Sequence, residues 1–287
     1  MLKYLKLFRL KHYIKNLLVF LPLIFGGQLL GSKAINSLWG FIAFGLISSA
    51  VYIINDIRDA EKDRQHPTKR NRPIASGAIS AKRAAALVPV LVILALGLNY
   101  LATGFEWLTY AIPLAYLALN IAYSFGLKNI PIIDITILAS GFLLRLIYGA
   151  ALTDIAISKW LYLTVIAASF YLALGKRRNE LIKHSGDATR NVLAYYNKGF
   201  LDKNMYLCMA LAVTFYSLWS IDSVTTQRVG NQNLIWTVPI VLLICMKYSM
   251  VIEGSSDGDP VEVLLGDKLL LGLIAVLAAV IGAVIYL

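Results

Sequence analysis

The length, composition and charge of this chain are those of a polytopic membrane protein. Of its 287 residues, 59% are hydrophobic and only 15% are charged, whereas a soluble domain has about 25% charged residues. The formal net charge is +11, but the basic residues are scattered between apolar runs, so a nucleic-acid partner is not expected.

Apolar runs long enough to cross a bilayer recur along the whole chain. A transmembrane helix needs about 20 apolar residues, and nine runs come close to that length. We therefore predict an all-α bundle of about nine transmembrane helices that forms a single domain over residues 1–287. The predicted spans are residues 17–31, 38–54, 84–103, 107–122, 132–152, 159–175, 205–222, 233–251 and 269–286.

The distribution of basic residues predicts how these spans are oriented. Most of the 27 Lys and Arg fall at the N-terminus, in the loops after the even-numbered spans or at the adjoining helix ends. The exceptions are Lys33, Lys159 and Arg228 on the opposite side, and Arg145 inside a span. Because basic loops stay in the cytoplasm, we expect a multi-pass protein of the cell membrane with a cytoplasmic N-terminus and an external C-terminus. The polar chemistry is then expected on the cytoplasmic face.

An acidic motif follows the second predicted span. If its helix continues past Ile54, then Asn55, Asp59 and Asp63 share one face, with Asp56 one position to the side. Oxygen ligands from short side chains suit Mg²⁺, which takes one or two carboxylates together with waters and substrate phosphates. We predict that all four bind Mg²⁺, and that the three aspartates are the catalytic residues.

Basic residues follow the acidic motif directly, in the stretch HPTKRNRP. Lys and Arg bind phosphate oxygens, while carboxylates can hold a metal ion on the same group. The two together predict a composite site for a Mg²⁺-diphosphate, with Lys69 and Arg72 binding the substrate. The alternative is a solvated loop whose acids and bases neutralise one another.

The NDxxDxxxD pattern at Asn55 resembles the first aspartate-rich motif of the UbiA superfamily of membrane prenyltransferases. The resemblance covers nearly the whole chain. It implies nine spans, a cytoplasmic N-terminus and Mg²⁺-dependent chemistry on isoprenoid substrates. The superfamily also has a second aspartate-rich motif, after the sixth span, that helps to bind a prenyl diphosphate.

The chain departs from the superfamily at that second motif. The loop after the sixth span contains Glu180 and Asp187, followed only by Asp202, and has no DxxxD or DxxD pattern. Further acids would be expected where the chain has Lys176, Arg177 and Arg178. Bases in place of acids indicate a substrate with additional anionic groups.

Four separated stretches resemble one branch of the superfamily, the decaprenyl-phosphate phosphoribosyltransferases. In chain order they are HPTKRNRPIASG, YSFGLK, LGKRRNEL and GDPVEVLLGDK. The resemblance implies transfer of the 5-phosphoribosyl group from 5-phosphoribosyl 1-diphosphate to a polyprenyl phosphate, with release of pyrophosphate. The product would supply the lipid-linked arabinose donor of certain bacterial cell walls.

This exchange of substrates explains the loss of acids. One acidic motif can hold Mg²⁺ on the leaving diphosphate, while the ribose 5-phosphate and the lipid phosphate require bases, for which we predict Lys176 and Arg177. The family places a diphosphate-binding lysine at Lys128, which could instead anchor the helix end at the interface. Asp134 is also predicted to bind substrate, although it could only favour the positive end of its helix.

Arg145 is the one Lys or Arg within a predicted span. It follows Asp134 by about three helical turns, so the two point the same way, and Arg145 lies roughly 16 Å deeper. Facing lipid would cost at least about 2.5 kcal/mol, so we expect it to face the bundle interior, with Asn99 and Asn120 as candidate neighbours. It is predicted to line the cavity for the lipid substrate, or else to bond a buried polar partner as part of the scaffold.

Two other functions remain open from the sequence. One is an ordinary prenyltransferase that moves a prenyl group from a prenyl diphosphate to an aromatic or other acceptor. The other is a membrane transporter, because broken spans and buried charges also mark transport pathways. The oligomeric state is open as well, a homo-oligomer included.

Overall fold

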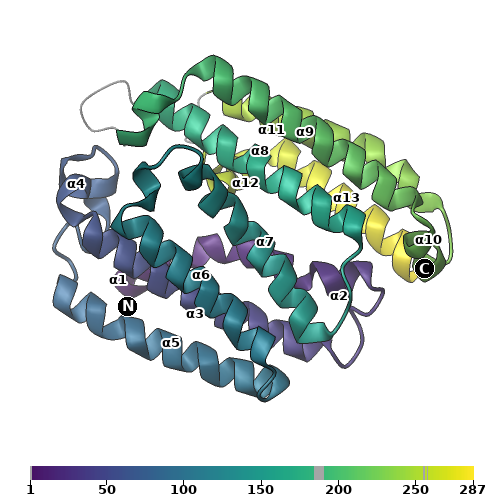
Figure 1. The fold of residues 1–287 in the computed structure, drawn as a ribbon, viewed down its shortest axis with the longest axis horizontal. Coiled ribbons are helices and arrows are strands. Elements are labelled where there is room, and N and C mark those ends of the chain that lie inside the picture. The colour runs from purple at the N-terminus through teal and green to yellow at the C-terminus, as the bar shows by residue number, and fades with distance from the viewer. Residues whose placement is uncertain (1, 184–190, 255, 257) are drawn as a thin grey trace. The chain divides into compact units, whose positions relative to one another are not determined.

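The computed structural model describes residues 2–183, 191–254, 256 and 258–287 (Figure 1). These residues form α-helices and short 3₁₀-helices, and none of the described residues lies in a strand. The predicted all-α class is confirmed.

Seven helices in the described residues are long and apolar enough to cross a membrane, so the chain is a multi-pass membrane protein. Each of them overlaps one of the predicted spans. They are Ala34–Arg58, Ala81–Thr103, Trp107–Phe125, Ile133–Thr153, Lys198–Ile221, Asn233–Glu253 and Lys268–Tyr286.

The remaining two predicted spans take other forms. The range 17–31 is divided between the 3₁₀-helix η1 (Leu10–Phe20) and the short α2 (Leu21–Phe25). Pro22 at this junction has no backbone N–H to donate, which interrupts a continuous hydrogen-bond ladder. The range 159–175 lies within α8 (Lys159–Lys183), whose last turns are strongly charged. The count of nine spans and the orientation of the termini therefore stay predictions.

The chain divides into two compact units, which are described separately; a single domain over residues 1–287 stays a prediction. Unit 1 comprises Met1–Leu23, Gln28–Ile137 and Leu144–Ile155. In this unit α3 lies along α5 (Figure 1). Its helices are α1 (Leu2–Phe8), η1, α3 (Ala34–Arg58), α4 (Ala60–Gln65), η2 (Lys69–Asn71), α5 (Ala81–Thr103), α6 (Trp107–Phe125), η3 (Leu127–Asn129) and most of α7 (Ile133–Thr153).

Two glycines let the N-terminal segment pack closely in unit 1. A Cβ on Gly45 of α3 would lie 2.2 Å from the ring of Tyr13, and one on Gly149 of α7 would lie 2.1 Å from the backbone oxygen of Val19. Both distances are far below van der Waals contact. Glycine at these two positions therefore allows η1 to lie directly against α3 and α7.

Unit 2 comprises Ile24–Gly27, Leu138–Leu143 and Ala156–Leu287. In this unit α8 and α9 lie side by side (Figure 1). Its helices beyond α8 are η4 (Asn191–Tyr195), α9 (Lys198–Ile221), α10 (Ser223–Val229), η5 (Asn233–Thr237), α11 (Val238–Glu253), α12 (Pro260–Gly266) and α13 (Lys268–Tyr286).

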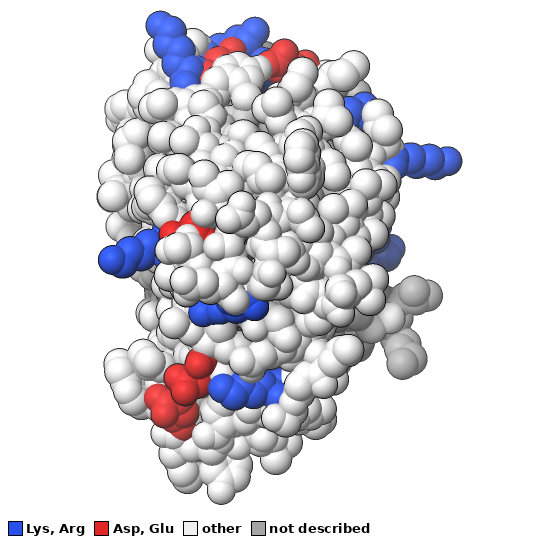
Figure 2. Space-filling view, turned by 90° about the vertical axis from the view of Figure 1, so that its right-hand side faces the viewer, with Lys and Arg blue, Asp and Glu red and all other residues white. Residues whose placement is uncertain are grey.

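The surface fits an apolar surrounding. Ile93 of α5 and Leu269 of α13 are 68% and 61% exposed, and Figure 2 shows one face on which charged residues are few among uncharged ones. Large apolar side chains left on the outside of long helices are expected where lipid tails cover them.

Candidate active site

The acidic motif lies where α3 ends and α4 begins. As predicted, the helix continues past Ile54, to Arg58, and Asp59 then leaves helical geometry with φ −96° and ψ 4°. Asp56 and Asp63, on either side of this break, are both buried. The break brings these two carboxylates to one guanidinium, that of Arg72, rather than leaving the motif on one straight helix.

Arg72 bridges the two buried carboxylates. Its Nη1 donates to Oδ1 of Asp56 at 3.1 Å and to Oδ2 of Asp63 at 2.7 Å. Arg72 follows η2 in extended conformation, which directs the chain back toward α3. Lys69 in η2 is half-buried, and its backbone N–H donates to Nδ1 of His66. Arg72 of this stretch thus lies against the acidic motif, while η2, which carries Lys69, contacts α4.

The end of α6 and the following η3 supply the partners of the other two motif residues. Nζ of Lys128, in η3, lies 2.5 Å from Oδ1 of Asp59. The hydroxyl of Ser124 donates to Oδ1 of Asn55 at 3.4 Å. The sequence placed Lys128 at a diphosphate site from family resemblance, and the structure brings it to the acidic motif.

Arg9 is a member of this site that the sequence did not reveal. It forms an ion pair with Asp56, and its guanidinium lies 4.9 Å from the ring centroid of Tyr52. Its sequence position, in a basic N-terminal segment before a span, is typical of simple interfacial anchoring. Only the packing of η1 on α3 brings it to a residue so distant in the chain.

The side chains of the acidic motif suit a magnesium ion that also binds substrate phosphates better than one held by protein ligands alone. Asn55, Asp56, Asp59 and Asp63 offer one amide and three carboxylate oxygens, the ligand type that Mg²⁺ prefers. Among the described residues, no three acidic, histidine or cysteine side chains form a ready-made metal cluster. An ion that keeps its waters and takes substrate phosphates needs only one or two of these carboxylates.

Asp134 and Arg145 lie deeper in unit 1. Asp134 is fully buried in the first turn of α7, and Arg145 is 3% exposed, so the predicted inward orientation of Arg145 is confirmed. Nε of Arg145 donates to Asn16 at 2.7 Å, and Nη2 donates to Ser48 and Tyr116 at 3.1 and 3.3 Å.

The predicted neighbours of Arg145 have other partners. Asn99 donates to the backbone oxygen of Thr109, and Asn120 to that of Tyr116. The guanidinium of Arg145 lies over the rings of Phe44 and Tyr116, at 4.7 and 4.8 Å from their centroids. This residue therefore ties η1, α3 and α6 to α7.

The basic stretch at the end of α8 forms ion pairs within unit 2. Lys176 lies 3.1 Å from Asp259. Fully buried Arg177 pairs with Glu180. The next residue, Arg178, donates a hydrogen bond from its Nε to Oδ1 of Asp202 at 2.5 Å. Asp187 lies outside the described residues.

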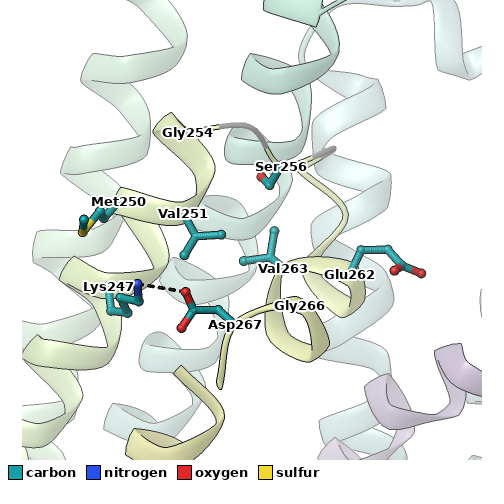
Figure 3. Close-up of a pocket in the computed structure, with 9 residues that line it drawn as sticks. All are labelled: Lys247, Met250, Val251, Gly254, Ser256, Glu262, Val263, Gly266 and Asp267. Atoms are coloured by element: carbon teal, nitrogen blue, oxygen red, sulfur yellow. Dashed lines mark ion pairs between the residues drawn. The ribbon is translucent and has the colours of Figure 1, made fainter. Parts of the chain in front are cut away.

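A polar cavity in unit 2 was not foreseen from the sequence. It lies between α11, α12 and α13, has a volume of about 530 Å³ and contains an ion pair of 2.8 Å between Lys247 and Asp267 (Figure 3). The hydrogen bond from Lys247, and next that from the backbone of Leu270, hold the pKa of the Asp267 carboxyl below its ordinary value. Glu262 and Ser256 also line this cavity.

Fold and site together define a multi-pass helical membrane protein with a polar site where a long helix ends. Residues 19–262 match the UbiA prenyltransferase family. The chain belongs to this family, which confirms the predicted resemblance and makes it a transferase.

Comparisons with individual proteins agree with the family. The decaprenyl-phosphate phosphoribosyltransferase of Corynebacterium glutamicum is 35% identical over 92% of this chain and 81% of that protein. The protein of the same name from Mycolicibacterium smegmatis is 35% identical over 98% and 92%. A UbiA homolog from Archaeoglobus fulgidus, bound to GPP and Mg²⁺, has the same fold, with a TM-score of 0.73 at 18% identity over 99% of this chain and 100% of that one.

Proposed function

We propose that this protein transfers the 5-phosphoribosyl group of 5-phosphoribosyl 1-diphosphate to a polyprenyl phosphate, and that the reaction depends on Mg²⁺. The observation that carries the proposal is 35% identity, over nearly the whole chain, to two proteins named decaprenyl-phosphate phosphoribosyltransferase. The site supports it, because Asp56, Asp59 and Asp63 each lie against Lys or Arg. Such a mixed site suits a substrate that carries several phosphates.

The proposed reaction forms one bond and breaks one bond. An oxygen of the lipid phosphate attacks C1 of the ribose, and the bond from C1 to the diphosphate oxygen breaks. Pyrophosphate leaves with the bonding electrons. Because the lipid phosphate is already ionised at neutral pH, no general base is needed, and the rate comes from positioning and charge stabilisation.

In the proposed reaction, the acidic motif binds the metal ion and the basic residues beside it bind the diphosphate. Asn55, Asp56, Asp59 and Asp63 would hold Mg²⁺, which when bound offsets the negative charge of the leaving diphosphate. Arg72 and Lys128 then exchange their carboxylate partners for diphosphate oxygens; both are partly exposed, at 26% and 16% of their side chains. These exchanges keep every charge paired when the donor binds.

Five further residues complete the proposal. Lys69 binds a phosphate of the donor, and Asp134 lines the substrate site. Lys176 and Arg177 are proposed phosphate ligands of unit 2, where the side chain of Lys176 is 25% exposed and that of Arg177 is fully buried. Arg145 serves the lipid acceptor indirectly, by positioning η1 through its bond to Asn16.

The location and pathway follow from the same proposal. Since most of the 27 Lys and Arg lie on one side of the predicted spans, we place the site on the cytoplasmic face of the cell membrane. The product would feed the lipid-linked arabinose donor for arabinogalactan in the cell wall. Membership in a transferase family favours an enzyme over the transporter alternative.

The test is a transfer assay with purified protein. Incubation with 5-phosphoribosyl 1-diphosphate labelled in the ribose, polyprenyl phosphate and Mg²⁺ should give a labelled lipid, and chelation of Mg²⁺ should abolish it. A parallel reaction contains labelled geranylgeranyl diphosphate and an aromatic acceptor. Label transfer only in the parallel reaction would reject the proposal in favour of an ordinary prenyltransferase.

A further inference from the structure

The N-terminal segment forms an open cavity that the residues of the proposed active site do not fill. It lies between α1 and the start of η1 and has a volume of about 340 Å³, far above the roughly 10–15 Å³ that suffices for one water molecule. Two apolar side chains, three cations and one imidazole line it. They are Leu5, Lys6, Arg9, Leu10, Lys11 and His12.

This lining has the chemistry of a site for an anion with a hydrocarbon tail. Of the described residues, none that lines the cavity is acidic, so its cations attract a negatively charged group. Leu5 and Leu10 are 42% and 45% exposed and give the cavity an apolar wall. A phosphate monoester on an isoprenoid chain needs both kinds of surface.

Arg9 connects this cavity to the acidic motif. It lines the cavity and pairs with Asp56. Its backbone is left-handed, with φ 51° and ψ 50°, a conformation that residues other than glycine rarely adopt. Such strain persists where the surrounding structure imposes it, and it gathers at functional sites. The cavity is thus separated from a predicted catalytic carboxylate by a single side chain.

The segment that carries the cavity is held firmly in place. Tyr13 and Val19 of η1 pack against glycines of α3 and α7 at distances that no larger residue would permit. The hydroxyl of Tyr13 also lies 3.1 Å from that of Ser49. Asn16 accepts the bond from buried Arg145. A site on such an element is preorganised, which reduces the entropic cost of binding.

We propose that this N-terminal cavity binds a phosphate monoester, and that this monoester is the headgroup of the polyprenyl phosphate acceptor. The choice of acceptor rests on the proposed function. Lys6 and Lys11 bind the phosphate, while Leu5 and Leu10 contact the first isoprene unit. Arg9 acts as a positioning residue that aligns the lipid phosphate relative to Asp56.

Binding of radiolabelled farnesyl phosphate to the purified full-length protein, without donor or Mg²⁺, tests this assignment. The double variant Lys6→Gln/Lys11→Gln should bind it at least about tenfold more weakly, because it loses charge-assisted contacts. Lys6→Arg/Lys11→Arg should retain binding. The matched control is Lys3→Gln, which removes a charge from α1 outside the cavity and should change the affinity less than about twofold.

Competition separates the sources of the phosphate. Farnesol, inorganic phosphate and phosphatidylglycerol should each displace farnesyl phosphate poorly. Equal competition by inorganic phosphate would assign the cavity to a free phosphate, and equal competition by phosphatidylglycerol to any anionic headgroup. Either result would overturn the lipid acceptor, and unchanged affinity in the Gln double variant would overturn the site itself.

The same preparations distinguish this inference from the proposed function. The Gln double variant should raise the KM for polyprenyl phosphate about tenfold or more and leave the KM for the phosphoribosyl donor unchanged. Wild-type protein that binds farnesyl phosphate through Lys6 and Lys11 but makes no phosphoribosyl lipid would reject the function alone. Normal transfer with an unchanged lipid KM in the variant would reject the cavity alone.

Discussion

The ion pairs at the end of α3 in unit 1 and at the end of α8 in unit 2 differ in which partner is buried, the acid or the base. In the first, two of the acids are the buried partners: the side chains of Asp56 and Asp63 are 2% and 6% exposed, while Arg9 and Arg72 are 19% and 26% exposed. In the second, two of the bases are the buried partners. Arg177 and Arg178 are 0% and 6% exposed, against 16% and 26% for their carboxylates.

This difference predicts which partner can be exchanged. A buried charge must keep a counter-charge, because leaving it unpaired is costly. Buried acids with accessible bases can accept a metal ion in place of a base. Buried bases with accessible acids can accept a phosphate in place of an acid. The contrast agrees with the sequence, in which one acidic motif is kept and bases stand where the second would be.

The largest effect should come from the acidic motif. Asp59→Ala removes a predicted Mg²⁺ ligand and the partner of Lys128, and we expect kcat to fall at least about 10³-fold, as when key charge stabilisation is lost. Glu61→Ala is the matched control, since this acid is exposed in α4 and pairs with Arg64, three residues away. A steady-state transfer assay decides: near-normal turnover in Asp59→Ala would refute the metal assignment.

The next effect concerns the buried bases of unit 2. Arg177→Gln removes the ion pair between Arg177 and Glu180, and we expect a loss of about 3 kcal/mol in the free energy of unfolding. Lys198→Gln, at the exposed start of α9, should have little effect. Thermal unfolding in detergent measures both. Because Arg177 is also a proposed phosphate ligand, the donor KM should rise as well. Lost stability with an unchanged donor KM would leave Arg177 with a structural role alone.

Local patterns predicted the fold class and most of the spans. Apolar runs of bilayer length are a strong signal, and seven predicted ranges overlap long apolar helices. The range 17–31 was harder, because composition alone cannot show that Pro22 marks a change from 3₁₀ to α geometry. In α8, charged residues continue the helix beyond the apolar run, so the helix is longer than the span that its hydropathy predicts.

The site was predictable where residues are close in sequence or share a motif. The continuation of α3 and the motif itself follow from local spacing, and Lys128 from family resemblance. The break at Asp59, which joins Asp56 and Asp63 through Arg72, depends on the fold of the following loop. Arg9 could not be found from spacing, because only tertiary packing brings it to Asp56.

A smaller effect should separate donor binding from metal binding in unit 1. Because Arg72 both competes with Mg²⁺ for Asp56 and Asp63 and binds the donor, Arg72→Ala should move two constants in opposite directions. The donor KM should rise about tenfold, the typical loss for a contact to a charged group, while the Mg²⁺ concentration for half-maximal activity should fall. Arg70→Ala, an exposed neighbour, should change neither. If both constants rise together, Arg72 does not occupy the position of the metal ion.

The smallest effect is a pH dependence in the cavity of unit 2, where the side chain of Asp267 is 20% exposed and the pKa of its carboxyl is lowered by the hydrogen bond from Lys247. A depressed folded-state pKa contributes stability above the unfolded value of about 3.9, and this contribution is lost as the pH falls through the folded pKa. Asp267→Asn keeps an oxygen to cap α13 at Leu270 but removes the charge. Its Tm should therefore be slightly below that of wild type at pH 7, and the two curves should converge as the pH falls below 4. A Tm difference that persists unchanged at low pH would show that the ion pair with Lys247 is not its source.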